Sequence, residues 1–300
     1  MIVAGVVTVV IVLVFALWIG AQRQQSALSV QVDRLIHAAA ASHAATQPGT
    51  QGLDAVPEPV ARYLRWALRT TQYIREVRIS QIGTLRTDVR SERWMPFEAE
   101  HIVVPPPIGF VWDARVRVAP LLHVRVRDAL IEGRGSGQVS LLSAFTVSAD
   151  ADTPEMNSGS LHRYLAEAVW YPTALLPSRT LQWAGIDRTR ALATLTDHGV
   201  SVSLEFRFAG TGEVSGIYTP ARWGKFAEGY RQAPWEGHFR DYRERDGILV
   251  PSEGDVGWYV NNEWQAVWKG SITAFRLRTQ REIIELVEER RTGSSSCSVQ

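Results

Sequence analysis

Residues 161–177, LHRYLAEAVWYPTALLP, hold the densest group of side chains that could do chemistry. In a helix, Arg163 and Glu167 stand four residues apart and can form an ion pair on one face. A carboxylate held over an apolar cavity would instead have a raised pKa, which suits a general acid or base. Glu167 therefore has two interpretations: an ordinary ion pair, or a catalytic carboxylate with His162 and Asp128 as candidate partners.

The sequence contains none of the linear motifs that mark common cofactor and nucleophile sites. It lacks the phosphate-loop pattern G-x-x-x-x-G-K-[ST] and the nucleophile elbow G-x-S-x-G. The glycines of 133–137 precede a strand-like segment, so they predict a hairpin or bulge and not a dinucleotide site. The histidines never recur at H-x-H or H-x-x-x-H spacing, and the only cysteine, Cys297, excludes an intramolecular disulfide. We expect no metal and no cofactor.

The composition is that of a folded and nearly neutral protein. Hydrophobic residues make up 45% and charged residues 21%, and the formal net charge is +1, which argues against a nucleic-acid partner. The 11 tryptophans are unusual, because this side chain favours cores, interfaces and ligand-lined grooves. The groove candidates are Trp94, Trp112, Trp170, Trp183, Trp258, Trp264 and Trp268. Together with Arg163, we take Trp112, Trp170 and Trp258 as the candidate ligand-binding residues.

The first segment, residues 1–22, predicts a transmembrane anchor. Residues 2–21 carry no charge and are about as long as a helix that crosses a bilayer, and Trp18 stands near their end. The alternative is a signal peptide cleaved near Ala21, but the apolar run is long and has no basic residue before it. Arg23 and Arg34 favour a cytoplasmic body by the positive-inside rule, but so small a charge difference leaves the side of the membrane open. We expect a single-pass protein of the cell membrane.

Residues 23–52 predict a helical stalk followed by a linker. Apolar residues recur at helical spacing from Leu28 to Ala39, and the segment TQPGTQG of 46–52 holds proline and glycine without apolar periodicity. The stalk would separate the membrane from the folded body.

Residues 53–278 predict an antiparallel β body. Alternating patterns such as Val200-Ser-Val-Ser-Leu-Glu-Phe206, with glycine- or asparagine-containing turns at short intervals, are typical of strands with one buried face. Helical patterns interrupt this region near 57–69 and 160–171. The fold class is thus mainly β (α+β): a curved antiparallel β-sheet or half-barrel with a few packed helices, preceded by one N-terminal transmembrane helix. A capping-box pattern at Thr279 predicts a last helix over 279–291, and 292–300 reads as a disordered tail.

Several motifs in order give the chain a resemblance to a known family. They are PEPVARYLR (57–65), WMPFEAEH (94–101), GFVWDAR (109–115), DALIEGRG (128–135), RYLAEAVWYPTALLP (163–177) and a closing stretch from WEG to GDVGW (235–258). They resemble a bacterial, membrane-associated family known only as a domain of unknown function, with the signature RYLAE-x-x-W-x-P. The resemblance implies that Arg163, Glu167, Trp170, Pro172, Trp112, Asp113 and Arg115 are signature positions, and it implies no activity. In outline, the expected fold is also similar to the half-barrels of lipoprotein carriers.

Three hypotheses for the function follow. The first is a membrane-anchored protein that binds a lipid or other apolar ligand in a Trp-rich groove, since a curved sheet covered by helices encloses apolar space. The second is an acid–base hydrolase or lyase centred on Glu167, which the missing motifs disfavour. The third is an interaction module for a membrane partner, the identity of which the sequence does not indicate. A carrier should show an apolar cavity, an enzyme should show Glu167 facing His or Asp, and an interaction module should show an exposed apolar patch without a cavity.

Overall fold

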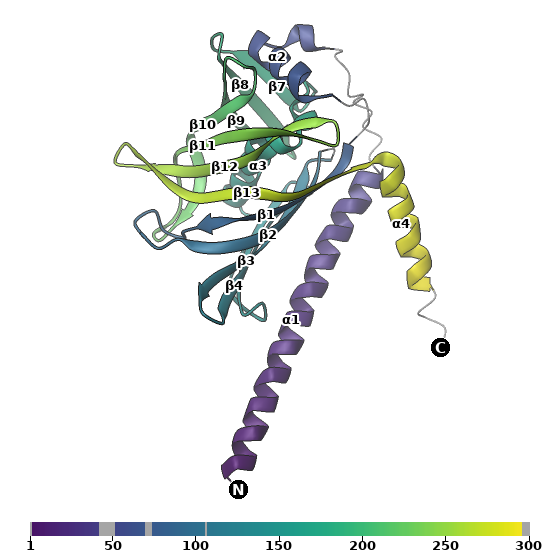
Figure 1. The fold of residues 1–300 in the computed structure, drawn as a ribbon, viewed down its shortest axis with the longest axis vertical. Helices are drawn as coiled ribbons and strands as arrows, with labels where there is room; N and C mark the ends of the chain where they lie inside the picture. Colours follow the sequence, from purple (N-terminus) through teal and green to yellow (C-terminus); the bar gives the residue numbers. More distant parts are fainter. Residues whose placement is uncertain (1, 42–51, 70–73, 106, 296–300) are drawn as a thin grey trace.

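The computed structural model describes residues 2–41, 52–69, 74–105 and 107–295, and its centre is one 13-stranded antiparallel sheet. The strand order β6-β5-β4-β3-β2-β1-β13-β12-β11-β10-β9-β8-β7 places the last strand beside the first. The sheet curls into a half-barrel around one helix (Figure 1). The predicted fold class, a half-barrel with few helices after a long apolar N-terminal helix, is therefore confirmed. The strands are β1 (Ile74–Leu85), β2 (Met95–Val104), β3 (Gly109–Ala119), β4 (Leu122–Ile131), β5 (Arg134–Leu141), β6 (Phe145–Ala151), β7 (Leu181–Gly185), β8 (Arg190–Asp197), β9 (Val200–Phe208), β10 (Val214–Phe226), β11 (Gly229–Arg245), β12 (Ile248–Val260) and β13 (Glu263–Thr279).

The helices lie at the ends of the chain and between the two halves of the sheet. Helix α3 connects β6 to β7 across the hollow of the half-barrel, and it begins earlier than the expected residue 160 because Thr153 caps its N-terminus by accepting a hydrogen bond from Met156 N. The helical elements are α1 (Ile2–Ala41), η1 (Leu53–Ala55), α2 (Glu58–Ala67), α3 (Pro154–Glu167), η2 (Ala168–Trp170), η3 (Pro172–Leu175) and α4 (Gln280–Ser295).

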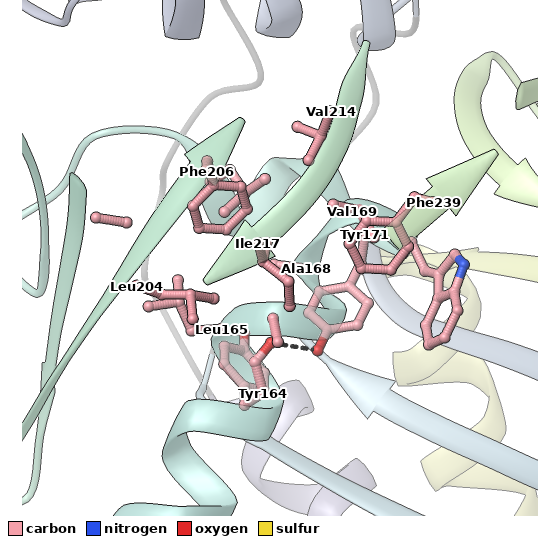
Figure 2. Packing of buried hydrophobic residues seen from close by; sticks show 14 of the residues in the cluster. Tyr164, Leu165, Ala168, Val169, Tyr171, Leu204, Phe206, Val214, Ile217 and Phe239 are labelled. Atoms are coloured by element: carbon pink, nitrogen blue, oxygen red, sulfur yellow. Dashed lines mark hydrogen bonds between the residues drawn. The ribbon is translucent and has the colours of Figure 1, made fainter. Parts of the chain in front are cut away.

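The main core lies between α3 and the concave face of the sheet. Figure 2 shows Leu165, Ala168 and Val169 packed against Phe206 and Ile217, which are inward-facing residues of β9 and β10. The hydroxyl group of Tyr171 donates a hydrogen bond of 2.6 Å to the carbonyl oxygen of Tyr164. This bond satisfies a buried polar group and fixes the turn from α3 into η2.

A second, smaller core lies on the outer face of the sheet. Val32, Leu35, Ile36 and Ala39 of α1 pack on Ile102 and Val104 of β2, Val111 of β3, Ala129 of β4 and Ile283 of α4. Helix α1 is continuous from Ile2 to Ala41, so the expected anchor (1–22) and the helical part of the expected stalk form one helix. The apolar spacing that predicted the helical stalk is the face that α1 buries against the sheet.

The C-terminal helix is longer than expected. Helix α4 continues to Ser295, past the expected end at 291, so residues 292–295 are helical and not part of a disordered tail. Residues 46–51 of the expected linker (46–52) and residues 296–300 of the expected tail, which include Cys297, lie outside the described residues.

Candidate functional site

Glycines allow α3 to lie very close to the sheet. A Cβ atom on Gly159 of α3 would meet the carbonyl oxygen of Trp223 at 3.0 Å, and one on Gly135 of β5 would meet Ser160 Oγ at 2.6 Å. Side chains larger than hydrogen at these positions would push the helix away from the strands. The close approach places the last turns of α3 within hydrogen-bonding reach of β4.

Arg163 of α3 is the centre of a charged cluster inside the half-barrel. Its Nε donates to Glu167 Oε1 at 2.8 Å, and its Nη1 donates to Asp128 Oδ2 at 2.6 Å. Its guanidinium group also lies over the rings of Trp112 and Phe110, with centroid distances of 4.8 and 5.2 Å. Arg163 therefore joins α3 to β3 and β4, and the i,i+4 pair with Glu167 is present as one part of this larger cluster.

The second carboxylate oxygen of Glu167 faces His101 of β2, with 3.4 Å between Oε2 and Nε2. His101 is fully buried between the rings of Phe110 and Trp170, and neither ring nitrogen has a hydrogen-bond partner among the described residues. Burial, and then the nearby Arg163, hold the pKa of His101 well below its ordinary value. His101 is therefore neutral at physiological pH, and its contact with Glu167 is not an ion pair there.

Both carboxyl groups of the cluster are less acidic than in water. Burial raises the pKa of Glu167 and of Asp128, and Arg163 opposes this increase at each group. The Glu167 side chain is 16% exposed and the Asp128 side chain 37%, so we expect desolvation to act more fully on Glu167. The charge of Glu167 raises the pKa of Asp128 further, so both carboxyl groups of the pair are harder to ionise than in water.

Arg222 of β10 supplies a second cation to the same region. Its Nη2 donates to the carbonyl oxygen of Gly159 at 3.1 Å, and its guanidinium group lies 4.6 Å from the ring centroid of Trp235 and 5.3 Å from that of Trp258. Its Nε atom is buried and has no hydrogen-bond partner among the described residues. Burial and the charge of Arg163 lower the pKa of Arg222 to about 10, so it remains protonated at neutral pH.

The cluster borders a cavity of about 280 Å³ inside the half-barrel. Its remaining walls are mainly aliphatic and aromatic, and the charged residues that line it are Arg86, Asp128, Arg163, Glu167, Arg222 and Asp255. The tryptophans that line it are Trp112, Trp170, Trp235, Trp258 and Trp268. Trp258 also lines two adjoining hollows, of about 280 and 370 Å³, so the space extends as a groove along the concave face. The volumes fall at the lower end of the range for small-molecule sites.

The structure brings together most of the residues that the sequence singled out, but not His162. Arg163, Glu167, Asp128, Trp112, Trp170 and Trp258 all line the cavity. His162 precedes Glu167 by five residues, which turns it about 140° away around the helix. Its Nδ1 lies 3.2 Å from the carbonyl oxygen of Ser158, and burial lowers its pKa to about 4. The histidine that faces Glu167 is His101.

The other tryptophans have separate positions. Trp183 packs on Phe206 and donates to the carbonyl oxygen of Leu175, whereas Trp264 lies against His238 on the outer face of the sheet. Trp94 stands beneath the cations of Arg86 and Lys269. These three do not line the cavity, whereas Trp235, which was not among the candidates, does.

The protein is thus a curled antiparallel half-barrel that holds a charged cluster in a Trp-lined cavity. The chain belongs to the family of unknown function DUF6920, whose model matches residues 54–276, and this confirms the resemblance drawn from the motifs. None of the curated proteins matches the sequence significantly.

Solved structures show a distant likeness. A domain from Vibrio parahaemolyticus, named for outer membrane lipoprotein sorting, matches with a TM-score of 0.39 and 9% identity over 80% of this chain and 99% of its own. A LolA superfamily protein from Nitrosomonas europaea matches with a TM-score of 0.31 and 9% identity, over 70% and 89% of the two chains. A β-barrel-like protein from Brucella abortus, of the domain of unknown function DUF1849, matches with a TM-score of 0.23 and 10% identity, over 69% and 99%.

Proposed function

We propose that this chain is a single-pass membrane protein that binds an amphiphilic ligand, an apolar chain or ring with an anionic group, in the Trp-lined cavity. The apolar walls favour burial of hydrocarbon, and the two half-buried arginines, Arg163 and Arg222, provide charge where an anionic group would be received. In the wider groove, Trp258 would contact the ligand along its length, because this side chain lines all three hollows.

The observation that carries the proposal is the unequal pairing of the two arginines. Arg163 is hydrogen-bonded to two carboxylates, whereas Arg222 is hydrogen-bonded to a carbonyl oxygen, lies against two indole rings and keeps a buried Nε without a partner among the described residues. An unsatisfied buried donor costs about 1–3 kcal/mol. A carboxylate or phosphate bound beside Arg222 would remove that cost and would be held by a charge-assisted hydrogen bond.

The membrane part of the proposal rests on α1. One described helix, Val6–Ala41, is long and apolar enough to cross a membrane, and a signal sequence would pass the same test. Its N-terminal portion exposes large apolar side chains, among them Ile11, Leu13 and Phe15. Its C-terminal portion is buried in the second core, so the helix is an integral part of the fold. This continuity supports an uncleaved anchor.

The experiment compares two fluorescent probes with the same acyl chain, one ending in a carboxylate and one in an alcohol, on the full-length chain in neutral detergent. Trp258→Ala should weaken the binding of both probes, because it removes a wall of the groove. Arg222→Met should weaken only the carboxylate, by roughly 10- to 150-fold, the equivalent of about 1.5–3 kcal/mol for a hydrogen bond to a charged group. Trp264→Ala, on the outer face, is the matched control and should bind both probes like the wild type. A folded wild-type protein that binds neither probe refutes the proposal.

One observation favours a second candidate, an acid–base enzyme. Glu167 lines the cavity, has a raised pKa and faces His101, as the catalytic hypothesis expected of it. However, Arg163 engages Glu167 and Asp128, and His101 is buried behind Glu167 and does not line the cavity. If this candidate is right, Glu167→Gln will abolish turnover of an ester or a β-eliminating substrate while the probes still bind.

A further inference from the structure

Two hairpin tips form an exposed apolar edge on the half-barrel. They are the β3–β4 tip, residues 119–123, and the β5–β6 tip, residues 141–147, and we call them together the rim. Leu121 is 101% exposed, Val147 61% and Phe145 48%, and Leu122 is 38% exposed. Clustered exposed apolar side chains of this kind mark a surface that meets a partner or a membrane.

Contacts between the two hairpin tips hold the rim in a defined shape. The two tips are joined by a contact of 3.0 Å between His123 Nε2 and Ser143 Oγ and by a backbone hydrogen bond from Leu142 N to the carbonyl oxygen of His123. Leu121, Leu142 and Ser143 have positive φ angles of 63°, 52° and 56°. A left-handed conformation is strained for a non-glycine residue, so the fold maintains these strained turns while Leu121 points into solvent.

Helix α1 leaves the body beside the rim. A Cβ atom on Gly20 would meet the Cβ of Ala144, at the β5–β6 tip, at 2.8 Å. Four residues further on, Gln24 Nε2 donates to Thr146 Oγ1 at 3.0 Å, and the carbonyl oxygen of Gln24 accepts from Arg127 at 2.9 Å. Figure 1 shows α1 following β1–β4 and continuing beyond them to the N-terminus. The rim therefore lies at the level where the helix loses contact with the sheet.

The part of α1 that precedes the rim has the length of a membrane span. From Ile2 to Gly20, at about 1.5 Å per residue, it measures about 28 Å, close to the roughly 30 Å of a hydrocarbon core. Trp18, 56% exposed, stands near its end, where interfacial aromatic residues are found. Because α1 continues without a break into the second core, the body cannot move away from a bilayer that holds the helix.

Charge at the rim complements a membrane that contains anionic lipid. A hollow of about 300 Å³ beside Leu121 is lined by Arg115, Arg117 and His123, with Glu98 as the opposing carboxylate. Arg115 and Arg117 are exposed on the outer face of β3. Arginines close to an anionic surface are attracted to it.

We infer that the rim is a bilayer-docking surface: Leu121, Leu122, Phe145 and Val147 enter the headgroup region of the same membrane that α1 spans, and Arg115 and Arg117 contact anionic headgroups. This inference rests on the part of the proposed function that places α1 in the bilayer, and it is independent of the cavity's ligand. It makes the body a membrane-apposed domain and not one raised on a stalk.

The test uses the full chain with Cys297→Ser, reconstituted into vesicles of phosphatidylcholine with phosphatidylglycerol. An environment-sensitive label is placed singly at Leu121→Cys or Phe145→Cys, with Ile186→Cys as the matched control, an equally apolar and 45% exposed residue in the β7–β8 connection. We expect the two rim labels to shift to shorter wavelength and to be quenched by lipids that carry a shallow doxyl group, and the control label to remain solvent-like. Vesicles without phosphatidylglycerol should reduce the rim signals.

The outcomes separate the two proposals. Rim labels that behave like the Ile186 label, in a chain that resists carbonate extraction, overturn the docking surface and leave the membrane anchor standing. A chain that carbonate removes from the vesicles overturns both. Rim labels that are shielded equally in detergent, and are not quenched by doxyl lipids, show that a second copy of the chain covers the rim and also overturn the inference. Leu121→Asp is a second test of the docking surface. In the chain labelled at Phe145→Cys, it should make the emission of the label more solvent-like without changing the fold around the cavity.

Discussion

Arg163→Gln tests whether the charged cluster holds α3 in the half-barrel. The substitution leaves the Glu167 and Asp128 carboxylates without the cation to which both are hydrogen-bonded. Breaking a fully buried ion pair by removing one partner costs about 3–5 kcal/mol, and because the Asp128 side chain is 37% exposed we take the lower end, about 3 kcal/mol. At about 2–4 °C per kcal/mol, the midpoint of thermal unfolding should fall by roughly 6–12 °C near neutral pH.

The pH dependence makes this prediction specific. Burial raises the pKa of both carboxyl groups in the folded state above their unfolded values, so each group destabilises the fold as pH rises through that interval. Without Arg163, whose charge opposes the rise, both pKa values increase further. The penalty of Arg163→Gln should therefore be largest near about pH 8 and shrink toward about pH 3, which lies below the ordinary pKa of both carboxyl groups, so that they are protonated in the folded and in the unfolded chain.

The assay follows tryptophan fluorescence of the full-length chain in neutral detergent during heating at the two pH values. Arg62→Gln is the matched control, because Arg62 makes an i,i+4 pair with Glu58 with the side chains 37% and 69% exposed, and such pairs contribute about 0.3–0.5 kcal/mol. The combination of Arg163→Gln with Glu167→Gln and Asp128→Asn, which removes the unpaired charges, should recover most of the lost stability. A penalty that is equal at both pH values, or that the combined variant does not relieve, would refute the electrostatic account.

Three other perturbations have definite expected outcomes. His238 Nδ1 lies 2.8 Å from Asp255 Oδ1 on the outer face, and this hydrogen bond raises the pKa of His238. The stabilisation that the bond provides is therefore complete below the ordinary pKa of histidine and is lost as the pH rises through the raised value. In urea unfolding, His238→Gln should destabilise the protein more near about pH 6 than near about pH 8.5. A chain that starts at residue 46 loses the α1 side chains of the second core and should unfold at lower urea concentration and bind a hydrophobic dye, whereas a chain that starts at residue 24 should not. A Cβ atom on Gly83 would clash with the backbone carbonyl oxygen of Lys269, so Gly83→Ala should lower the yield of folded protein, as measured by gel filtration and near-UV circular dichroism.

The sequence predicted the sheet well because its signals are local. Residues 200–208 alternate between apolar and polar, and β9 is buried at every second position from Val202 to Phe208. The pairing of β1 with β13 could not be predicted in this way, because the two strands lie at opposite ends of the body and no local pattern records the contact. The free stalk was expected for a similar reason: the apolar face of 28–39 predicts a helix but does not say against what the helix packs.

The site was only partly predictable for related reasons. The i,i+4 spacing of Arg163 and Glu167 is a local signal, and their pair is present. His101 shares the inward alternation of Phe97 and Ala99 in β2, so strand periodicity could have placed it in the interior, although not opposite Glu167. No such signal marks Arg222, because an irregularity between Thr219 and Arg222 breaks the alternation of β10.

The two interior arginines have different roles: Arg163 stabilises the fold, and Arg222 is available to a ligand. Arg163 has two carboxylates and two aromatic rings as partners, and the cluster it forms links α3 to β3 and β4, so a structural role accounts for it fully. Arg222 contacts the carbonyl oxygen of Gly159 and two indole rings, feels the Asp128 and Glu167 carboxylates only through their charge, and keeps a buried Nε that is unsatisfied among the described residues. A residue kept for stability alone would not retain this unsatisfied donor, since an apolar side chain of similar volume could pack between the same rings. Arg222, and not the more conspicuous Arg163–Glu167 pair, is therefore where recognition of an anionic ligand should be sought.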